Sequence, residues 1–384
     1  MLKKNMKNIS CSRDRIAVIV LSAGYSSRMS DFKPLLKFGD KTALEYIIDT
    51  FHKAGIMDII VVAGHNSEKI QNSCKGLEVD FVYNSNYPEG MYTSVVEGVK
   101  NLDEKIGGFF ILPVDIPLVK DRTIIEIKET FKQSEKGIIH PVFNGKRGHP
   151  PLISSCYKEK IVDNRGDGGL KRLLEDHNMD SLDIQVVDQA ILLDMDTKEE
   201  YMRLLEYYKN SKIPNLDECR AILNKYCVWK NVIKHCEKVR EVAMKITEAL
   251  INKGFRLNST LIEAAALLHD VERDKPEHAV KGWELLNKLG YCDVADIIKE
   301  HMDIIPERNS ITEKEIVYLS DKMVIGDKVV SIKERFKGPL DKFKENKKVL
   351  EIIKRRKMNT EIIASKINKS GIDIYKILDV KSFV

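Results

Sequence analysis

The sequence of 384 residues lacks paired cysteines. Its seven Cys are scattered along the chain, and none belongs to a Cys-x-x-Cys pair. An odd number of isolated thiols argues against a disulfide-stapled secreted protein and against a zinc site built from cysteine. We therefore expect reduced thiols and a cytoplasmic location.

Long apolar runs are also missing. A helix needs ~18 or more consecutive apolar residues to span a bilayer, whereas the run behind the basic N-terminus, Ile16 to Leu21, has only six. We expect neither a membrane span nor a signal peptide. With 43% hydrophobic and 32% charged residues, the chain can nevertheless bury a core, which excludes a disordered protein.

Positive charge is scarce in the body of the chain and concentrated at its ends. Residues 1–15 have net charge +4 and residues 331–384 have +8, so that residues 16–330, with 43 basic and 50 acidic side chains, have −7. An acidic body does not favour a nucleic-acid-binding core. The basic tail 336–384 has helical periodicity. We interpret its charges as a solvated helix face, with phosphate steering or partner docking as the alternative.

The hydrophobic pattern changes near residue 210. Before that point, short apolar runs alternate with amphipathic stretches, which is typical of βαβ units. The expected strands are 16–21, 58–64, 79–84, 108–113 and 184–188, and the expected helices include 42–55 and 93–102. After it, the periodicity is helical throughout, over 232–250, 259–271 and 313–330. We predict an α/β doubly wound, mainly parallel sheet over residues 1–210 and an all-helical domain over 215–384.

A loop of small residues follows the first expected strand, in the run LSAGYSSRMSDFKPLL. Ser22, Ala23 and Gly24 let the backbone approach a ligand, and the N–H groups of such a loop can surround an anion. Arg28 and Lys33 add positive charge suited to a triphosphate. The loop is neither G-x-G-x-x-G nor a Walker A motif. Taken alone, it could also be a tight strand-to-helix connection with two solvated cations.

Six ordered blocks between residues 14 and 208 resemble the MobA-like nucleotidyltransferases, which include the molybdenum cofactor cytidylyl- and guanylyltransferases. The blocks are LSAGYSSRM with Lys33, NSNYPEGMYTS, LPVDIPLV, GKRGHPPL, GDGGLKRLL and LLDMDTKEEY. The resemblance implies a Rossmann-like, Mg²⁺-dependent enzyme that joins a nucleotide to a phosphate acceptor and releases pyrophosphate. It implies CTP and molybdopterin as substrates, and a molybdenum hydroxylase apoprotein as a candidate partner.

The same resemblance implies roles for individual residues. Arg28, Lys33 and Asp115 would be catalytic, and Asp115, at the carboxyl end of a buried strand, would also hold Mg²⁺. Its partner would be Asp194 or Asp196, which point to opposite faces of an extended chain, so that only one is expected at the metal. The other, or Thr197, would cap helix 197–209. The nucleotide and acceptor pocket would be formed by Leu21, Ser22, Ala23, Gly24, Gly90, Met91, Ser94, Arg147, Gly148, His149 and Asp167.

The residue at position 23 bears on the choice of base. The guanylyl branch of the family reads L-A-G-G in this loop and the cytidylyl branch reads L-A-A-G, so Ala23 favours CTP by resemblance. Ser22 departs from both. Lys198 and Glu200 depart from the Pro and Asp that the family has near its second metal ligand, although Asp194 and Asp196 are both present.

Histidines and carboxylates form a second pattern in the helical half. Imidazole and carboxylate groups are the usual ligands of Zn, Fe, Mn or Co, and helices of a bundle can direct them to one core. His269 and Asp270 end an apolar stretch, where a metal would supply the partners that buried polar groups need. For His278 alone, a surface position is the favoured alternative. The pattern consists of His235, His269, Asp270, His278, His301 and Asp321.

This pattern resembles the HD-domain metal-dependent phosphohydrolases over about residues 215–335. The resemblance implies that these six residues hold one or two divalent transition metals, and that metal-activated water hydrolyses a phosphoester. It does not name the substrate. Arg273 would meet a substrate phosphate or remain in solvent. Two alternatives stay open, namely transfer to a sugar or polyol phosphate and a helical half that only senses nucleotides.

Overall fold

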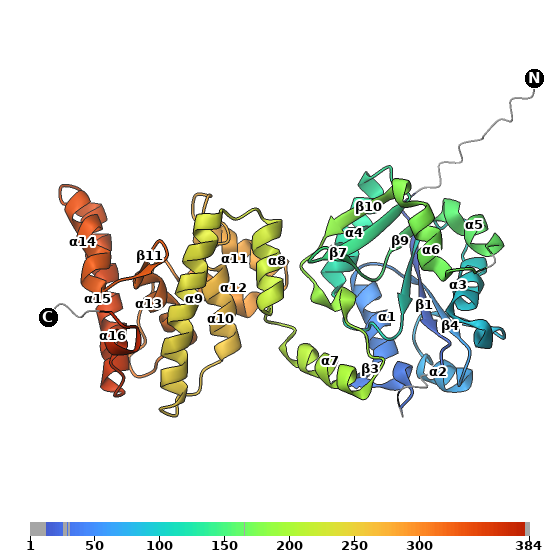
Figure 1. Cartoon of the computed structure of the whole chain (residues 1–384), viewed down its shortest axis with the longest axis horizontal. Coiled ribbons are helices and arrows are strands. Elements are labelled where there is room, and N and C mark those ends of the chain that lie inside the picture. The colour runs from blue at the N-terminus through green and yellow to red at the C-terminus, as the bar shows by residue number, and fades with distance from the viewer. Residues whose placement is uncertain (1–12, 26–28, 30, 165, 381–384) are drawn as a thin grey trace, which may run out of the picture. The chain divides into compact units, whose positions relative to one another are not determined.

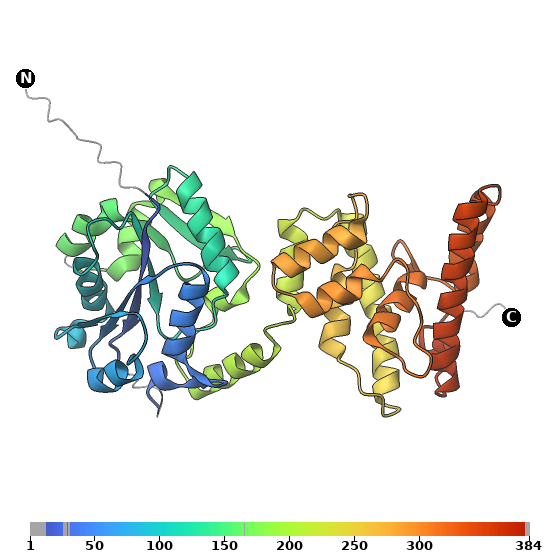
Figure 2. The same ribbon diagram turned by 180° about the vertical axis from the view of Figure 1, so that it is seen from behind.

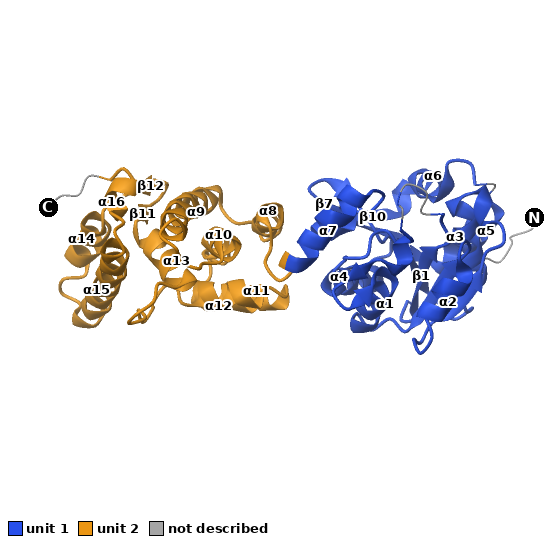
Figure 3. Ribbon diagram, turned by 90° about the horizontal axis from the view of Figure 1, so that it is seen from below, with its two compact units in different colours: residues 1–209 blue, residues 210–384 orange. Residues whose placement is uncertain are grey.

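The computed structural model describes residues 13–25, 29, 31–164 and 166–380, and it divides the chain into two compact units, residues 1–209 and 210–384 (Figure 3). Arg28, one of the expected catalytic residues, lies outside the described residues. None of the described helices combines the length and the apolar character needed to cross a membrane.

The first unit is built on an eight-stranded sheet (Figure 1). Strand β1 lies in the middle and pairs in parallel with β4 and β6, while β9 runs antiparallel to its neighbours β6 and β7. The strand order is β10-β7-β9-β6-β1-β4-β5, with β8 beside β7. The strands are β1 (Ile16–Ser22), β4 (Asp58–Ala63), β5 (Asp80–Tyr83), β6 (Gly108–Pro113), β7 (Ile138–Phe143), β8 (Lys146–Arg147), β9 (Leu152–Ser154) and β10 (Ser181–Gln185), and β2 (Lys37–Phe38) and β3 (Lys41–Thr42) form a separate hairpin.

Helices cover both faces of this sheet. On one face, the ring of Phe51 in α1 meets that of Phe110 in β6 at 5.5 Å. On the other, Val95 and Val99 of α3 pack against Ile19 of β1. Because both faces are covered, every residue of β1 is buried, which confirms the expected doubly wound fold. The helices are α1 (Ala43–Lys53), α2 (Ser67–Ser73), α3 (Met91–Lys100), α4 (Asp121–Gln133), α5 (Lys158–Asp163), α6 (Gly169–Asp176) and α7 (Lys198–Asn210), with 3-10 turns η1 (Lys33–Leu35), η2 (Tyr87–Glu89), η3 (Ser155–Tyr157), η4 (Asn178–Asp180) and η5 (Gln189–Leu192).

Two details of the sheet differ from expectation. The last strand lies at 181–185 rather than 184–188, and the buried Val186 and Val187 follow its end. Strand β7 was not expected at all. It contains Pro141, which lacks the N–H that a ladder needs and ordinarily counts against a strand.

The second unit is helical, as expected. Its helices are seen from the opposite side in Figure 2, where the C-terminal pair is red. Helix α9 packs against α10 and α13, and α15 packs against α13 and α14. The helices are α8 (Leu216–Lys225), α9 (Lys230–Ile251), α10 (Ser259–Leu268), α11 (His278–Lys288), α12 (Cys292–Lys299), α13 (Glu313–Lys322), α14 (Ile332–Lys342), α15 (Lys347–Lys369) and α16 (Ile374–Ile377).

One expected helix of this unit is wrong in its second half. Helix α13 ends at Lys322, and the chain then forms a hairpin of β11 (Val324–Ile325) and β12 (Lys328–Val329). Gly326 has φ +60°, a conformation that glycine adopts without strain. A Gly-Asp pair between apolar residues is a hairpin signal, and it overrides the helical periodicity of 313–330.

Candidate active sites

The first candidate site lies where β1 and β6 end side by side. Leu21 of β1 is in register with Pro113 of β6, so the segments that leave these strands meet at the carboxyl edge of the sheet, where α/β folds bind ligands. Lys33, in η1, places its Nζ 3.4 Å from Asp115 Oδ2 and 2.5 Å from Asp196 Oδ1. One ammonium thus lies between two carboxylates that are 81 residues apart in sequence.

The residues around Asp196 show how the two aspartates differ. Thr197 Oγ1 accepts a hydrogen bond from the Glu200 amide, and Glu200 Oε2 accepts one from the Thr197 amide. Thr197 and Glu200 therefore cap α7, which leaves Asp196 free to face Lys33. Asp194 is exposed. Partial desolvation and the nearby charges of Glu200, Asp196 and Asp115 raise the pKa of Asp194.

A cavity of about 440 Å³ lies in the same unit. Leu21, Met91, Arg147, Gly148 and His149, all expected pocket residues, line it. The residues that complete its wall include Tyr92, Val95, Pro113, His140, Gly168, Gly169 and Leu174. The structure therefore brings together in one cavity residues from five of the six sequence blocks.

The backbone at one end of this cavity requires glycine. A Cβ on Gly148 would lie 2.4 Å from the carbonyl oxygen of Ile191, closer than atoms can approach. The next residue, His149, donates its amide to that oxygen at 2.9 Å. Burial lowers the pKa of His149, so its ring stays neutral at pH 7. Arg147 is held by Asp183 at 2.7 Å and by Asn178.

The remaining expected pocket residues are not among those that line the cavity. Ser22 is buried and its hydroxyl has no partner among the described residues. Ala23 is buried and Gly24 is exposed in the loop beyond it. Gly90 precedes α3 with φ +119°. Asp167 is exposed beside Gly168.

Sequence reasoning missed Asn84. Its side-chain amide donates to Ser94 Oγ and Thr93 Oγ1, both at 2.9 Å, and its Oδ1 accepts from the Asn86 amide. This buried amide ties the end of β5 to α3, so Ser94 serves as an anchor in the structure. The signal was present, because a polar residue ends an apolar run at the carboxyl edge of a sheet.

An aromatic group beyond the loop was missed as well. The ring of Tyr25 lies 5.2 Å from the rings of both His65 and Tyr87. The three residues come from different segments, and no spacing in the sequence connects them.

The second candidate site gathers all six expected ligands. Ligand atoms of His235, His269 and Asp270 lie within 4.8 Å of one another, and so do those of Asp270, His278 and His301. Asp270 is common to both groups. Asp321 joins the first, because its Oδ1 is 3.2 Å from His235 Nε2 and 3.8 Å from His269 Nε2.

Backbone carbonyls orient three of these imidazoles. The Nδ1 atoms of His235, His269 and His301 face the carbonyl oxygens of Gly326, Ala266 and Ile298, respectively. A carbonyl only accepts, so Nδ1 carries a proton, and in the neutral form of each ring the lone pair of Nε2 is available to a metal. Such outer hydrogen bonds are typical of histidines that bind metals.

The electrostatics of this cluster come from burial and close charges. Burial lowers the pKa of His269 to about 4. Burial opposes ionisation of Asp270 and Asp321, but neighbouring histidines and, for Asp321, Lys322 outweigh it and lower the pKa of both carboxyls. Burial alone would lower the pKa of His235, yet the hydrogen bond and charge of Asp321 raise it.

The donor set fits a divalent metal. His269 Nε2 is buried and has no hydrogen-bond partner among the described residues, a cost that a metal would remove. His278 Nε2 and His301 Nε2 lie 3.2 Å apart, an arrangement that suits two nitrogens sharing a cation. Neutral imidazole and carboxylate together favour a transition metal over Mg²⁺.

A cavity of about 420 Å³ opens beside this cluster. His235, Asp270 and Asp321 line it, together with Arg273 and Lys322. Arg335 and Arg356 of the C-terminal helices also line it, a proximity to the histidines that the sequence pattern did not predict.

Comparison with known families finds a match in each half of the chain. Residues 18–182 match the family model of the MobA-like NTP transferase domain, and residues 232–324 match that of the HD domain. The chain therefore contains a MobA-like NTP transferase domain and an HD domain. The two resemblances inferred from sequence are confirmed.

Individual relatives match the first domain. The bifunctional protein GlmU of Francisella tularensis subsp. novicida (strain U112) is 24% identical over 167 residues, which are 42% of this chain and 36% of GlmU. This chain thus spans about a third of the length of the curated relatives it matches. Among solved structures, Rv0371c of Mycobacterium tuberculosis H37Rv is 25% identical, with 50% of this chain and 97% of that one covered and a TM-score of 0.46. Molybdopterin-guanine dinucleotide biosynthesis protein A of Archaeoglobus fulgidus is 13% identical, with 50% and 99% covered and a TM-score of 0.40.

Proposed function

We propose that the first unit transfers the cytidylyl group of CTP to the phosphate of molybdopterin. An oxygen of the acceptor phosphate bonds to the α-phosphorus, and the bond from that phosphorus to the bridging oxygen breaks, which releases pyrophosphate and leaves molybdopterin cytosine dinucleotide. Such a transfer needs positioning and charge neutralisation rather than a covalent enzyme intermediate. The observation that carries the proposal is the meeting of Lys33 with Asp115 and Asp196 at the carboxyl edge of the sheet.

The residues present fit a magnesium ion. Carboxylate oxygens are the ligands that Mg²⁺ prefers, and Asp115 and Asp196 supply them. Asp194 is near enough that their negative charges help to raise its pKa. When bound, Mg²⁺ would neutralise triphosphate oxygens. Lys33, and by resemblance Arg28, would add positive charge where pyrophosphate leaves.

The assignment of CTP as the nucleotide and of molybdopterin as the acceptor rests on finer features of the pocket. Ala23 supports CTP, and the cavity lined by Met91, Gly148 and His149 has a volume in the range of small-molecule sites. A sugar or polyol phosphate is the alternative acceptor. Delivery of the product to a molybdenum hydroxylase, and a cytoplasmic setting, remain predictions.

We further propose that the second unit hydrolyses a phosphoester with one or two transition metals bound by its six ligands. Such a metal would activate water, while Asp270, between His278 and His301, would join the two halves of the cluster. A nucleotide sensor without activity is the alternative, but a binding module needs no complete ligand set. Metal analysis after anaerobic purification should find one or two metals per chain, and their absence would refute the hydrolase.

Thermal denaturation tests the choice of nucleotide. With Mg²⁺ present, CTP should raise the melting temperature of the full chain more than GTP does, because only the matching base fills its pocket. An equal or larger shift with GTP would overturn the base assignment, while leaving the class of reaction standing.

A further inference from the structure

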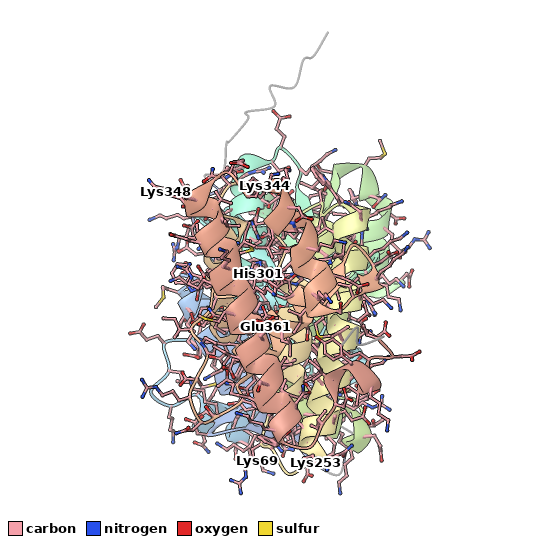
Figure 4. All side chains as sticks on the ribbon, turned by 90° about the vertical axis from the view of Figure 1, so that its left-hand side faces the viewer. Lys69, Lys253, His301, Lys344, Lys348 and Glu361 are labelled. Atoms are coloured by element: carbon pink, nitrogen blue, oxygen red, sulfur yellow. The ribbon has the colours of Figure 1, made fainter. Side chains whose placement is uncertain are left out.

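Two arginines of the C-terminal helices α14 and α15 are partly shielded from solvent. Arg335 on α14 and Arg356 on α15 line the cavity of the second unit, and both are half-buried, whereas Lys333 and Lys354 on the same helices are exposed. Figure 4 looks onto α14 and α15, where Lys344 and Lys348 mark one end of the pair. The tail is therefore more than a solvated face.

These arginines have no ion-pair partner in the described part of the chain. Neither guanidinium forms an ion pair or a hydrogen bond there, and the Nε of each is buried. Both lie close enough to Lys322 for the like charges to repel. Gathering unpaired cations in a half-buried hollow costs free energy, and a bound anion would recover it.

The third cation connects this group to the histidine cluster. Lys322 Nζ donates to Asp321 Oδ2 at 2.5 Å and to the carbonyl oxygen of His301 at 3.0 Å. One cavity is thus lined both by candidate metal ligands and by two guanidinium groups that have no ion-pair partner among the described residues. Guanidinium forks match the oxygens of a phosphate group.

We propose that the second unit acts on an organic molecule with at least two phosphate groups, one placed at the metal ligands and another held by Arg335 and Arg356. This inference rests on the proposed hydrolase function. Water oxygen bonds to the first phosphorus, the ester P–O bond breaks, and the leaving oxygen takes up a proton, while the second phosphate stays on the product. Phe336, Met302 and Ile353 also line the cavity and suit an organic group better than inorganic pyrophosphate.

The test compares substrates that differ by one phosphate. The full chain with Mn²⁺ is given adenosine 3′,5′-bisphosphate, AMP or pyrophosphate, and phosphate release is measured. The bisphosphate should have the highest kcat/KM. Because a hydrogen bond to a charged group contributes substantially, Arg335→Gln and Arg356→Gln should each raise the KM for the bisphosphate about tenfold, with a much smaller effect on the KM for AMP and with the metal content unchanged. Lys354→Gln, on the same helix as Arg356, should change none of these, and Arg356→Lys should restore part of the loss.

Other results would overturn the inference. Equal kcat/KM for AMP and the bisphosphate, a preference for pyrophosphate, or an unchanged KM in both arginine variants would each do so while leaving the hydrolase in place. If the metal-loaded wild type releases no phosphate from any probe, the hydrolase proposal fails instead. In that case, calorimetry measures the affinity for the bisphosphate. A loss of affinity in Arg335→Gln and Arg356→Gln supports the second phosphate site, and unchanged affinity in both variants overturns it.

Discussion

At the scale of single residues, Lys33 is central to the first site, because its ammonium lies between the carboxylates of Asp115 and Asp196 and contacts both. Replacing it with methionine keeps the length of the side chain and removes the charge. We expect Lys33→Met to lower pyrophosphate release by about 100-fold or more, the usual loss when a group that stabilises transition-state charge is removed. Lys37→Met, at an exposed lysine of β2, is the matched control. Comparable activity in the two variants would remove Lys33 from the catalytic account.

His140 gives the first unit a pH dependence. Burial, with a contribution from Arg147 that Asp183 opposes, lowers the pKa of His140 to about 4, compared with about 6.5 in an unfolded chain. Between these values the unfolded chain binds more protons, so stability falls as the pH is lowered through this window. Relative to His140→Gln, the wild type should lose up to about 3 kcal/mol of unfolding free energy by pH 4. Urea titrations of both proteins at pH 7 and pH 4.5 measure this, and a constant difference would contradict it.

Single residues also show where sequence reasoning stops. Met91, Gly148 and His149 could be assigned to a pocket because they stand in ordered blocks, and they do line one cavity. Arg335 and Arg356 could not be connected to the histidines. Helical periodicity tells which residues share a face of one helix, but the partner of that face is set by packing in three dimensions.

At the scale of elements, continuous apolar runs located β1 and β6 because both faces of these strands are covered. The hairpin of β11 and β12 was missed, yet it has a function in the site. The carbonyl of Gly326, at its turn, orients His235 through a 2.9 Å hydrogen bond. An element of four paired residues thus orients a candidate metal ligand on the long helix α9.

Alanine at the turn tests this connection. Gly326→Ala puts a side chain on a backbone with φ +60°, which costs about 1 kcal/mol and displaces the carbonyl. Metal affinity should fall about 10-fold or more, as it does when outer partners of metal ligands are lost. Gly254→Ala, at φ +90° with open space around it, imposes similar strain away from the cluster. Equal metal content in the two variants, measured by mass spectrometry, would exclude a role for the hairpin.

At the scale of the whole molecule, the chain combines two compact units, for which we propose separate reactions. Asp115→Asn should abolish pyrophosphate release and leave the metal content unchanged. Asp270→Asn should lower the metal content and leave pyrophosphate release unchanged, because Asp270 belongs to both candidate ligand groups. If either substitution lowered both pyrophosphate release and metal content to the same degree in a folded protein, the two sites would not be independent.

The most direct measurement is incubation of the full chain with molybdopterin, Mg²⁺ and either CTP or GTP, followed by mass analysis of the products. The account predicts molybdopterin cytosine dinucleotide with one pyrophosphate for each dinucleotide, and markedly less product from GTP. No dinucleotide from either nucleotide, or faster formation of the guanine product, would contradict it.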